Sequence, residues 1–116
     1  MPNTLTSDEA LRLWRTAIVD LVRADRPDLS MRQMAILVTV YTAPPPHTVR
    51  GLASKLNVTK PAITRALDRM GRSGLLTRRR DQNDRRNVVV QRTLAGALAV
   101  ERLGDRIVER YKQLSR

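Results

Sequence analysis

Hydroxyl and basic side chains that can contact nucleic acid follow one another between residues 59 and 69. Arg65 and Arg69 lie one helical turn apart, and each guanidinium can donate to O6 and N7 of a guanine. Thr64 can reach a base edge or a thymine methyl group. The positive end of a helix that starts at Thr59 favours a phosphate. The residues that we expect to contact DNA here are Thr59, Lys60, Pro61, Thr64, Arg65 and Arg69.

A second basic group lies at and beside the tip of a predicted hairpin. Arg85 at this tip can enter the minor groove, whose negative potential deepens in narrow A·T-rich stretches. Asp84 would repel a phosphate if it were free, so we expect it to pair with Arg86 and to shape the loop. Arginines 78–80 alternate between the two faces of their strand, so two of them can meet phosphates. The expected DNA contacts of the hairpin are Arg78, Arg80, Arg85 and Arg86.

Local signals predict the elements that position these side chains. A helix over residues 50–56 is followed by Asn57, which tolerates left-handed turn geometry, and then by a second helix that ends near Gly74. Strands over residues 75–80 and 87–93 form the hairpin. This order is typical of a mainly α fold with a small β-hairpin wing, the winged helix-turn-helix. The inward residues of the two helices are expected to be Leu52, Ala53, Leu56, Ile63, Ala66, Leu67 and Met70.

Further helices are predicted on both sides of this module. A capping box at Thr6 begins a helix over residues 6–26, and another at Ser30 begins a helix that ends before prolines 44–46. A last helix covers residues 94–114. The helix that starts after Ser30 is expected to bury Met34, Leu37, Val38 and Tyr41. The first and last helices are expected to form a dimer interface through Leu11, Trp14, Ile18, Leu103, Ile107, Tyr111 and Leu114.

The net charge of +11 is concentrated in one part of the chain. Residues 47–94 hold twelve Lys and Arg against three Asp, a net charge of +9. Residues 1–46 are neutral as a group, and residues 95–116 carry +2. A localised basic surface predicts a polyanionic partner, and double-stranded DNA is the leading candidate.

The length of 116 residues predicts a single winged-helix domain, residues 1–116, with a DNA-binding lobe over 30–94 and dimerisation helices over 6–26 and 94–114. The chain has no Cys, which excludes disulfides and thiolate metal ligands, and His47 is expected to be an exposed loop residue rather than a ligand. No catalytic set of residues is visible, so we expect neither an enzyme nor a cofactor. Without a membrane-spanning run or signal pattern, the protein is expected in the cytoplasm, associated with the nucleoid and without a membrane partner.

The chain resembles the MarR family of bacterial transcription regulators over residues 29–103. The matching segments are Leu52-Ala53 through Thr59-Lys60, Thr64-Arg65, Leu67-Asp68-Arg69-Met70, Gly74-Leu75, and the wing Asp84-x-Arg86 followed by Val88 to Gly96. The wing is the most specific of these segments. The resemblance implies a homodimer on a pseudo-palindromic site, with two recognition helices in successive major grooves, and a repressor or related regulator.

Three features depart from the family pattern. Arg92 stands where the family usually has an apolar residue, and Leu94 replaces a common proline. The chain extends about twenty residues past Gly96, where the family has a longer helical region, so we expect a smaller or differently arranged dimer interface. The resemblance also implies a small aromatic effector, whereas regulation by cysteine oxidation is impossible in this chain. The candidate residues for an effector pocket are Trp14, Arg15, Met34 and Tyr41.

Two other classes of binding protein stay open on the sequence alone. An architectural or phage-type DNA binder would use phosphate and wing contacts with little sequence preference. A winged-helix protein–protein module would instead turn the same basic face towards an acidic partner. The base-reading residue types between 59 and 69 favour a sequence-specific regulator over both.

Overall fold

The structure is a computed structural model that describes residues 4–24 and 28–114. The chain divides into two compact units, residues 29–100 and residues 1–28 with 101–116. The break predicted for the first helix at residues 25–28 lies mostly outside the described residues.

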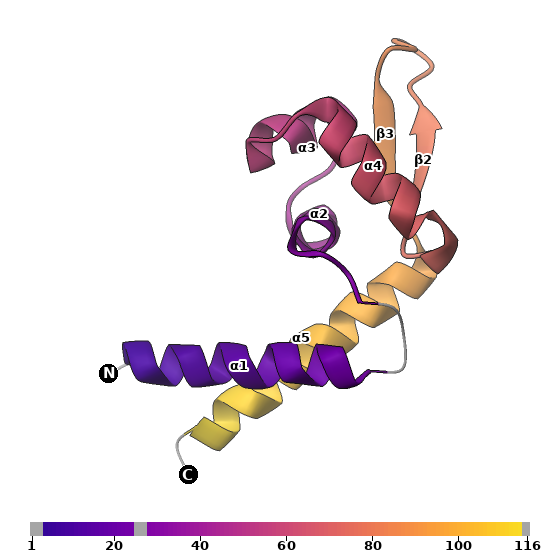
Figure 1. Ribbon diagram of the computed structural model, residues 1–116. Helices are drawn as coiled ribbons and strands as arrows, with labels where there is room; N and C mark the ends of the chain where they lie inside the picture. The colour runs from indigo at the N-terminus through magenta and orange to yellow at the C-terminus, as the bar shows by residue number, and fades with distance from the viewer. Residues whose placement is uncertain (1–3, 25–27, 115–116) are drawn as a thin grey trace. The chain divides into compact units, whose positions relative to one another are not determined.

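The unit of residues 29–100 is a winged helix, as predicted (Figure 1). Its helices are α2 (Met31–Thr42), α3 (Val49–Leu56) and α4 (Lys60–Met70), with a short 3-10 turn at Gly71–Ser73. Its strands are β1 (His47–Thr48), β2 (Leu76–Arg80) and β3 (Val88–Arg92), and they form an antiparallel sheet in the order β1-β3-β2. The helix α5 (Leu94–Leu114) begins here and continues into the other unit.

Side-chain caps and special backbone angles fix where these helices begin and end. The Thr48 hydroxyl accepts from the Gly51 amide at 2.9 Å, and the Thr59 hydroxyl accepts from the Ala62 amide at 3.2 Å. Asn57 adopts the predicted left-handed conformation between α3 and α4, with φ of 57°. Gly74 turns the chain from the 3-10 segment into β2 with φ of 72°. The helix-turn-helix geometry is therefore set by local sequence.

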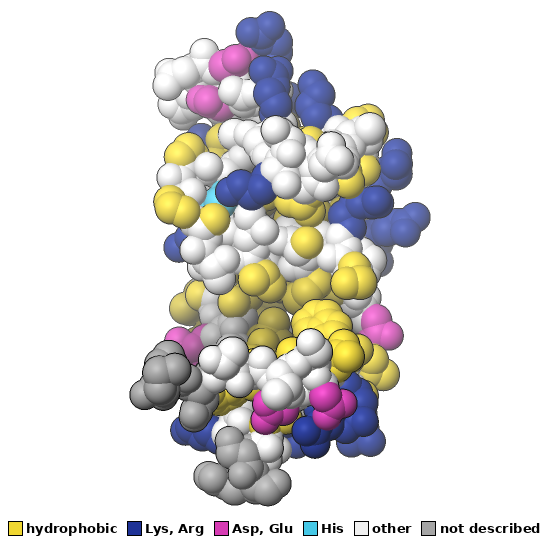
Figure 2. Space-filling model, turned by 90° about the vertical axis from the view of Figure 1, so that its left-hand side faces the viewer, with side chains coloured by type: hydrophobic (Ala, Val, Ile, Leu, Met, Phe, Trp, Pro, Cys, Tyr) yellow, Lys and Arg dark blue, Asp and Glu magenta, His cyan; other side chains and the backbone are white. Residues whose placement is uncertain are grey.

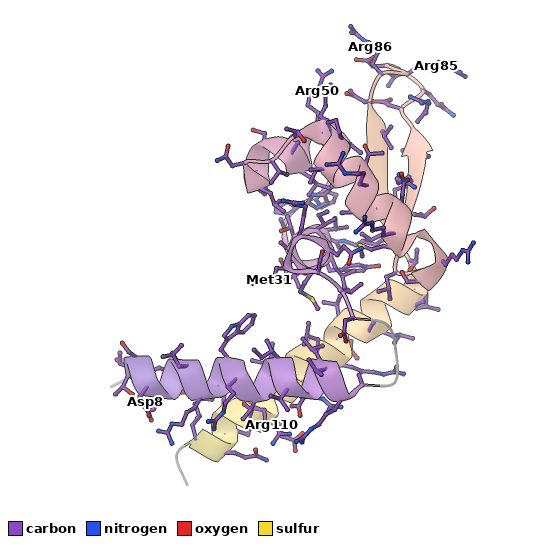
Figure 3. The ribbon with its side chains drawn as sticks, in the orientation of Figure 1. Asp8, Met31, Arg50, Arg85, Arg86 and Arg110 are labelled. Atoms are coloured by element: carbon purple, nitrogen blue, oxygen red, sulfur yellow. The ribbon has the colours of Figure 1, made fainter. Side chains whose placement is uncertain are left out.

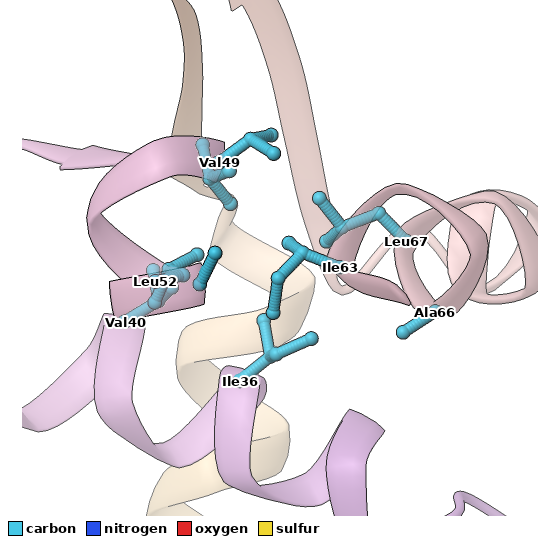
Figure 4. Close-up of a cluster of buried hydrophobic side chains, with 9 residues drawn as sticks. Ile36, Val40, Val49, Leu52, Ile63, Ala66 and Leu67 are labelled. Atoms are coloured by element: carbon cyan, nitrogen blue, oxygen red, sulfur yellow. The ribbon is translucent and has the colours of Figure 1, made fainter. Parts of the chain in front are cut away.

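The core of this unit lies where α2, α3 and α4 meet (Figure 4). Its largest fully buried side chains are Ile36, Val40, Leu52 and Ile63. The face predicted for α2 was partly wrong, because Ile36 and Val40 are its deepest residues whereas Met34, Val38 and Tyr41 are half-buried. Helix α2 packs against α4 and β3, and apolar residues on more than one side hide its period.

His47 is buried rather than exposed in a loop, so that prediction was wrong. It lies in β1, opposite Val90 of β3, and only 6% of its surface is accessible. Its Nε2 lies 3.1 Å from the carbonyl oxygen of Ala43, the C-cap residue of α2. The pairing with β3 joins residues far apart in the sequence, and no local sequence signal predicts it.

Tyr41 joins three parts of the winged unit through its hydroxyl group. The hydroxyl donates to the Leu75 carbonyl at 2.6 Å and accepts from the Thr93 amide at 2.9 Å. Gly96 in α5 packs so closely that a Cβ there would overlap both the Tyr41 hydroxyl and the Leu75 carbonyl. The end of α2, the start of the hairpin and the start of α5 are therefore held at one point.

Arg92, which departs from the family pattern, closes the end of α2. Its Nε donates to the Val40 carbonyl at 2.8 Å and its Nη2 to the Ala43 carbonyl at 3.1 Å. The guanidinium also lies 5.9 Å from the centre of the Tyr41 ring. A cation suits this position, because the last carbonyls of a helix carry partial negative charge.

The other unit contains α1 (Ser7–Arg23) and the C-terminal part of α5. The predicted capping box at Thr6 is present, with the Thr6 hydroxyl accepting from the Glu9 amide. Arg110 donates to both carboxylate oxygens of the buried Asp20 at 2.7 and 2.8 Å, which lowers the pKa of that carboxyl. No helix in the described part of the chain is long and apolar enough to cross a membrane.

The two glycines of α5 offer a matched test of the junction at Tyr41. Gly96→Ala should destabilise the protein by about 1–3 kcal/mol, because the added methyl group overlaps a hydroxyl and a carbonyl. Gly104→Ala meets nothing within 4 Å and should stabilise it by about 0.5–1 kcal/mol through helix propensity. Urea unfolding followed by circular dichroism measures both changes. Equal effects of the two substitutions would contradict the close packing at Gly96.

Candidate nucleic-acid interface

Helix α4 has one buried face and one exposed polar face. Ile63, Ala66, Leu67 and Met70 are buried, as predicted, and Ala62 is buried as well. The predicted contact residues of this helix and its cap are all exposed: Thr59, Lys60, Pro61, Thr64, Arg65 and Arg69. The exposed face therefore combines the residue types that donate to base edges with those that bind phosphates.

The wing is joined to α4 by an ion pair that the sequence did not predict. Arg78 of β2 donates from Nη2 to the Asp68 carboxylate of α4 at 2.8 Å. Arg80, two residues further along β2, donates from Nη1 to the Arg85 carbonyl at 2.8 Å. Both strand arginines assigned to phosphates are thus bonded to protein groups in this structure. Arg79 lies opposite Val89 on the other face of the strand.

The hairpin loop is organised by its two aspartates. Asp84 Oδ1 accepts from the Arg86 backbone amide at 3.1 Å and from Arg86 Nε at 3.2 Å, so the predicted pair is present. Asp81 Oδ1 accepts from the Asn83 amide at 2.9 Å. These bonds hold the loop in shape without burying Arg86, whose side chain is 83% exposed.

Positive charge at the wing acts directly on the Asp84 carboxyl. Its pKa is lowered mainly by the hydrogen bond from the Arg86 side chain, then by the Arg86 amide, with a smaller contribution from the charge of Arg50. The carboxylate therefore stays ionised well below neutral pH and keeps its hold on Arg86. Arg85 and Arg86 project to opposite sides of the loop (Figure 3).

Within the winged unit, Lys and Arg side chains gather at the hairpin end and along one side, as the dark-blue atoms in the upper part of Figure 2 show. Arg50 belongs to this end and was not among the predicted contact residues. It is exposed in the first turn of α3. Only the folded chain brings α3 and the wing loop near one another, so sequence spacing gave no signal for Arg50.

The residues predicted for dimerisation all belong to the unit built from α1 and the end of α5. On α1, Leu11, Trp14 and Ile18 are 66, 51 and 38% exposed. On α5, Tyr111 is 37% exposed, and the half-buried members are Leu103, Ile107 and Leu114. Helix α1 therefore presents apolar side chains on one face. That this face forms a dimer interface stays a prediction.

The effector prediction draws on residues from both units. Trp14 and Arg15 belong to one unit, and Met34 and Tyr41 belong to the other. The hydroxyl of Tyr41 already bonds to backbone groups at Leu75 and Thr93, so this side chain has a structural task. The effector pocket stays a prediction.

Over residues 4–24 and 28–114, no group of three or more His, Cys, Asp or Glu is placed to hold a metal ion.

Solved structures of transcriptional regulators share this fold. BldR from Sulfolobus solfataricus is 29% identical, with a TM-score of 0.59 over 88% of this chain and 78% of that one. MarR is 25% identical, with a TM-score of 0.63 over 90% of this chain and 72% of that one. AbfR, solved in a complex with DNA, is 19% identical and supports the fold, with a TM-score of 0.66 over 88% of this chain and 71% of that one.

A family model for the MarR family matches residues 29–88, which is just over half of the chain. The matched segment contains α2, α3, α4 and the hairpin up to the first residue of β3. Together with the winged fold, this match shows that the chain belongs to the MarR family of transcriptional regulators.

Proposed function

We propose that this protein is a sequence-specific regulator of transcription, a repressor that binds double-stranded DNA as a homodimer on a pseudo-palindromic operator. The observation that carries the proposal is the exposed face of α4, on which Thr64, Arg65 and Arg69 stand opposite a fully buried face. A helix anchored in this way can enter the major groove as a rigid element. Residues 30–94 form the DNA-binding lobe in this proposal.

The homodimer is supported by the apolar face of α1. Leu11, Trp14 and Ile18 are large, exposed and spaced to lie on one side of the helix. Such a surface on a small protein marks an interaction site, and a two-fold contact between copies matches the symmetry of a palindromic operator. In this proposal the interface is formed by these residues of α1 and by Leu103, Ile107, Tyr111 and Leu114 near the end of α5. A dimer seated in two successive grooves occludes the duplex, which favours repression.

Selection from a pool of random-sequence duplexes at ~150 mM salt tests the proposal, because non-specific binding weakens at that salt concentration. The regulator should enrich a pseudo-palindromic motif with half-sites about one helical turn apart. Retention of DNA without any motif would indicate an architectural binder instead. Failure to retain duplex DNA would point to a protein partner for the basic face.

Arg65→Ala should weaken binding to the enriched site by about 1–3 kcal/mol and relax the preference at one base pair of each half-site. The physical reason is the loss of a bidentate contact to a guanine. Arg32→Ala removes an exposed arginine from the first turn of α2 and serves as the control, with unchanged preference. Equal losses on every duplex would show that Arg65 contacts only phosphate.

Arg85→Ala should weaken binding mainly at sites with A·T-rich flanks. The narrow minor groove of such flanks has the strongest negative potential, and the exposed Arg85 side chain is free to enter it. Fluorescence anisotropy with duplexes that differ only in their flanks measures the effect. A loss that is independent of flank composition would contradict insertion into the minor groove.

Trp14→Glu should convert a dimer into a monomer at micromolar concentration, because it places a charge in the proposed apolar interface. Leu94→Glu makes the same kind of change at an apolar residue that is 78% exposed and lies outside that interface, so it should leave the dimer intact. Sedimentation velocity distinguishes the two states. A wild-type protein that sediments as a monomer would contradict the dimer.

A further inference from the structure

Gln33 is a buried polar residue of the winged unit that bonds to two elements at once. It lies in the first turn of α2, and only 7% of its surface is exposed. Its Oε1 accepts from the backbone amide of Ser30, the N-cap residue of α2, at 2.7 Å. Its Nε2 donates to the backbone carbonyl of Ala66 in α4 at 3.3 Å. The capping box follows from the sequence, whereas the second bond joins residues 33 positions apart.

The two partners fix the kind of side chain that can stand at this position. The Ser30 amide can only donate a hydrogen bond, and the Ala66 carbonyl can only accept one. A neutral amide carries an acceptor and a donor on one planar group, so it satisfies both partners. An ionised carboxylate has no donor, and an apolar side chain has neither group. Because the site is buried, bulk water does not compensate a partner that has lost its hydrogen bond.

The bond to Ala66 holds α4 at the level of its base-reading residues. Ala66 directly follows Arg65, and Arg69 is three residues further on. Ala66 lies on the buried face of α4, in the cluster that also contains Ile36 of α2 (Figure 4). Apolar contacts in that cluster fix which face of α4 is buried, but they are non-directional and leave the helix able to slide along its axis. A hydrogen bond to one carbonyl is directional and opposes that sliding.

We infer that Gln33 is a positioning residue for base recognition. Its amide holds α4 in one axial position against the start of α2, so that Arg65 and Arg69 reach the base edges together. The inference rests on the proposed function and adds to it a residue that does not touch DNA. Hydrogen bonds to base edges need a fixed donor geometry, whereas the attraction between a basic surface and phosphates is independent of sequence. A shift of α4 therefore lowers the preference for the operator before it lowers binding to DNA in general.

The experiment measures, by fluorescence anisotropy, the ratio of the affinities for the enriched operator and for an unrelated duplex of equal length. Gln33→Met keeps the unbranched shape of the side chain and removes both bonding groups. It should lower the ratio roughly tenfold, the loss expected when one bidentate base contact is misplaced, and change binding to the unrelated duplex little. A wild-type ratio in Gln33→Met would overturn the inference.

Gln33→Glu adds a pH dependence to the same measurement. At about pH 9 the introduced carboxyl is ionised and has no donor for the Ala66 carbonyl, so the ratio should match that of Gln33→Met. At about pH 5.5 burial favours the protonated carboxyl, whose hydroxyl can donate to Ala66 while its other oxygen accepts from Ser30. The ratio should then return towards the wild-type value measured at the same pH. A ratio that stays low at the acid pH would contradict the donor role of the amide.

Ile36→Val separates positioning from stability. It removes one methyl group from a fully buried side chain one turn further along α2 and leaves both bonds of Gln33 in place. It should lower the midpoint of thermal unfolding and keep the wild-type ratio. An equal loss of the ratio in Ile36→Val and Gln33→Met would show that Gln33 acts through stability alone and would overturn the inference.

The inference and the proposed function fail in different ways. A wild-type protein that binds all duplexes equally, or binds none, would overturn the proposed function and the inference with it. A wild-type preference that Arg65→Ala relaxes and Gln33→Met does not would overturn the inference alone.

Discussion

Burial of one face of α4 is the constraint on which the rest of the winged unit depends. Ile63 on this face is fully buried against Ile36, Val40 and Leu52, and burying one such side chain contributes about 1.5–3 kcal/mol. Helix rotation is then no longer free, because turning α4 would expose Ile63 and Leu67 to water. The remaining residues of the same helix must then face the solvent. The placement of Arg65 and Arg69 on the outside is therefore a consequence of hydrophobic packing rather than of any contact that they make themselves.

The wing is tied to this core by polar contacts at its base. The Tyr41 hydroxyl binds backbone groups on both sides of the hairpin, and the Arg78–Asp68 pair joins β2 to α4. An ion pair with exposed members contributes little stability, so the value of Arg78 lies in its orientation of the strand. Further out, Asp84 forms an ion pair with Arg86, and other arginines leave positive charge on the surface. The chain thus separates a scaffold of neutralised arginines from a set of arginines that are free for a ligand.

Elements with strong local signals could be predicted, and contacts between distant segments could not. Thr59 acts through its hydroxyl on the next turn, and Asn57 through its own backbone, so the start of α4 and the turn before it followed from residue type. The end near Gly74 was less accurate, because α4 ends at Met70 and Gly74 follows a 3-10 turn. His47 was predicted in a loop because its partner Val90 lies 43 residues away. The alternation of arginines 78–80 gave the two faces of the strand, but the Asp68 carboxylate that binds Arg78 belongs to another element. Ile36 and Val40 were missed because a helix packed on several sides has no single apolar stripe.

In the proposed function α4 lies in the major groove of DNA, and methylation protection tests this placement most directly. Dimethyl sulfate methylates N7 of guanine on the major-groove edge, the atom that Arg65 and Arg69 can bind. On an operator enriched by the wild-type protein, guanines in two half-sites about one helical turn apart should be protected. Arg65→Ala should restore methylation of a guanine in each half-site. Full methylation of every guanine while the protein remains bound would place α4 outside the major groove and contradict the claim.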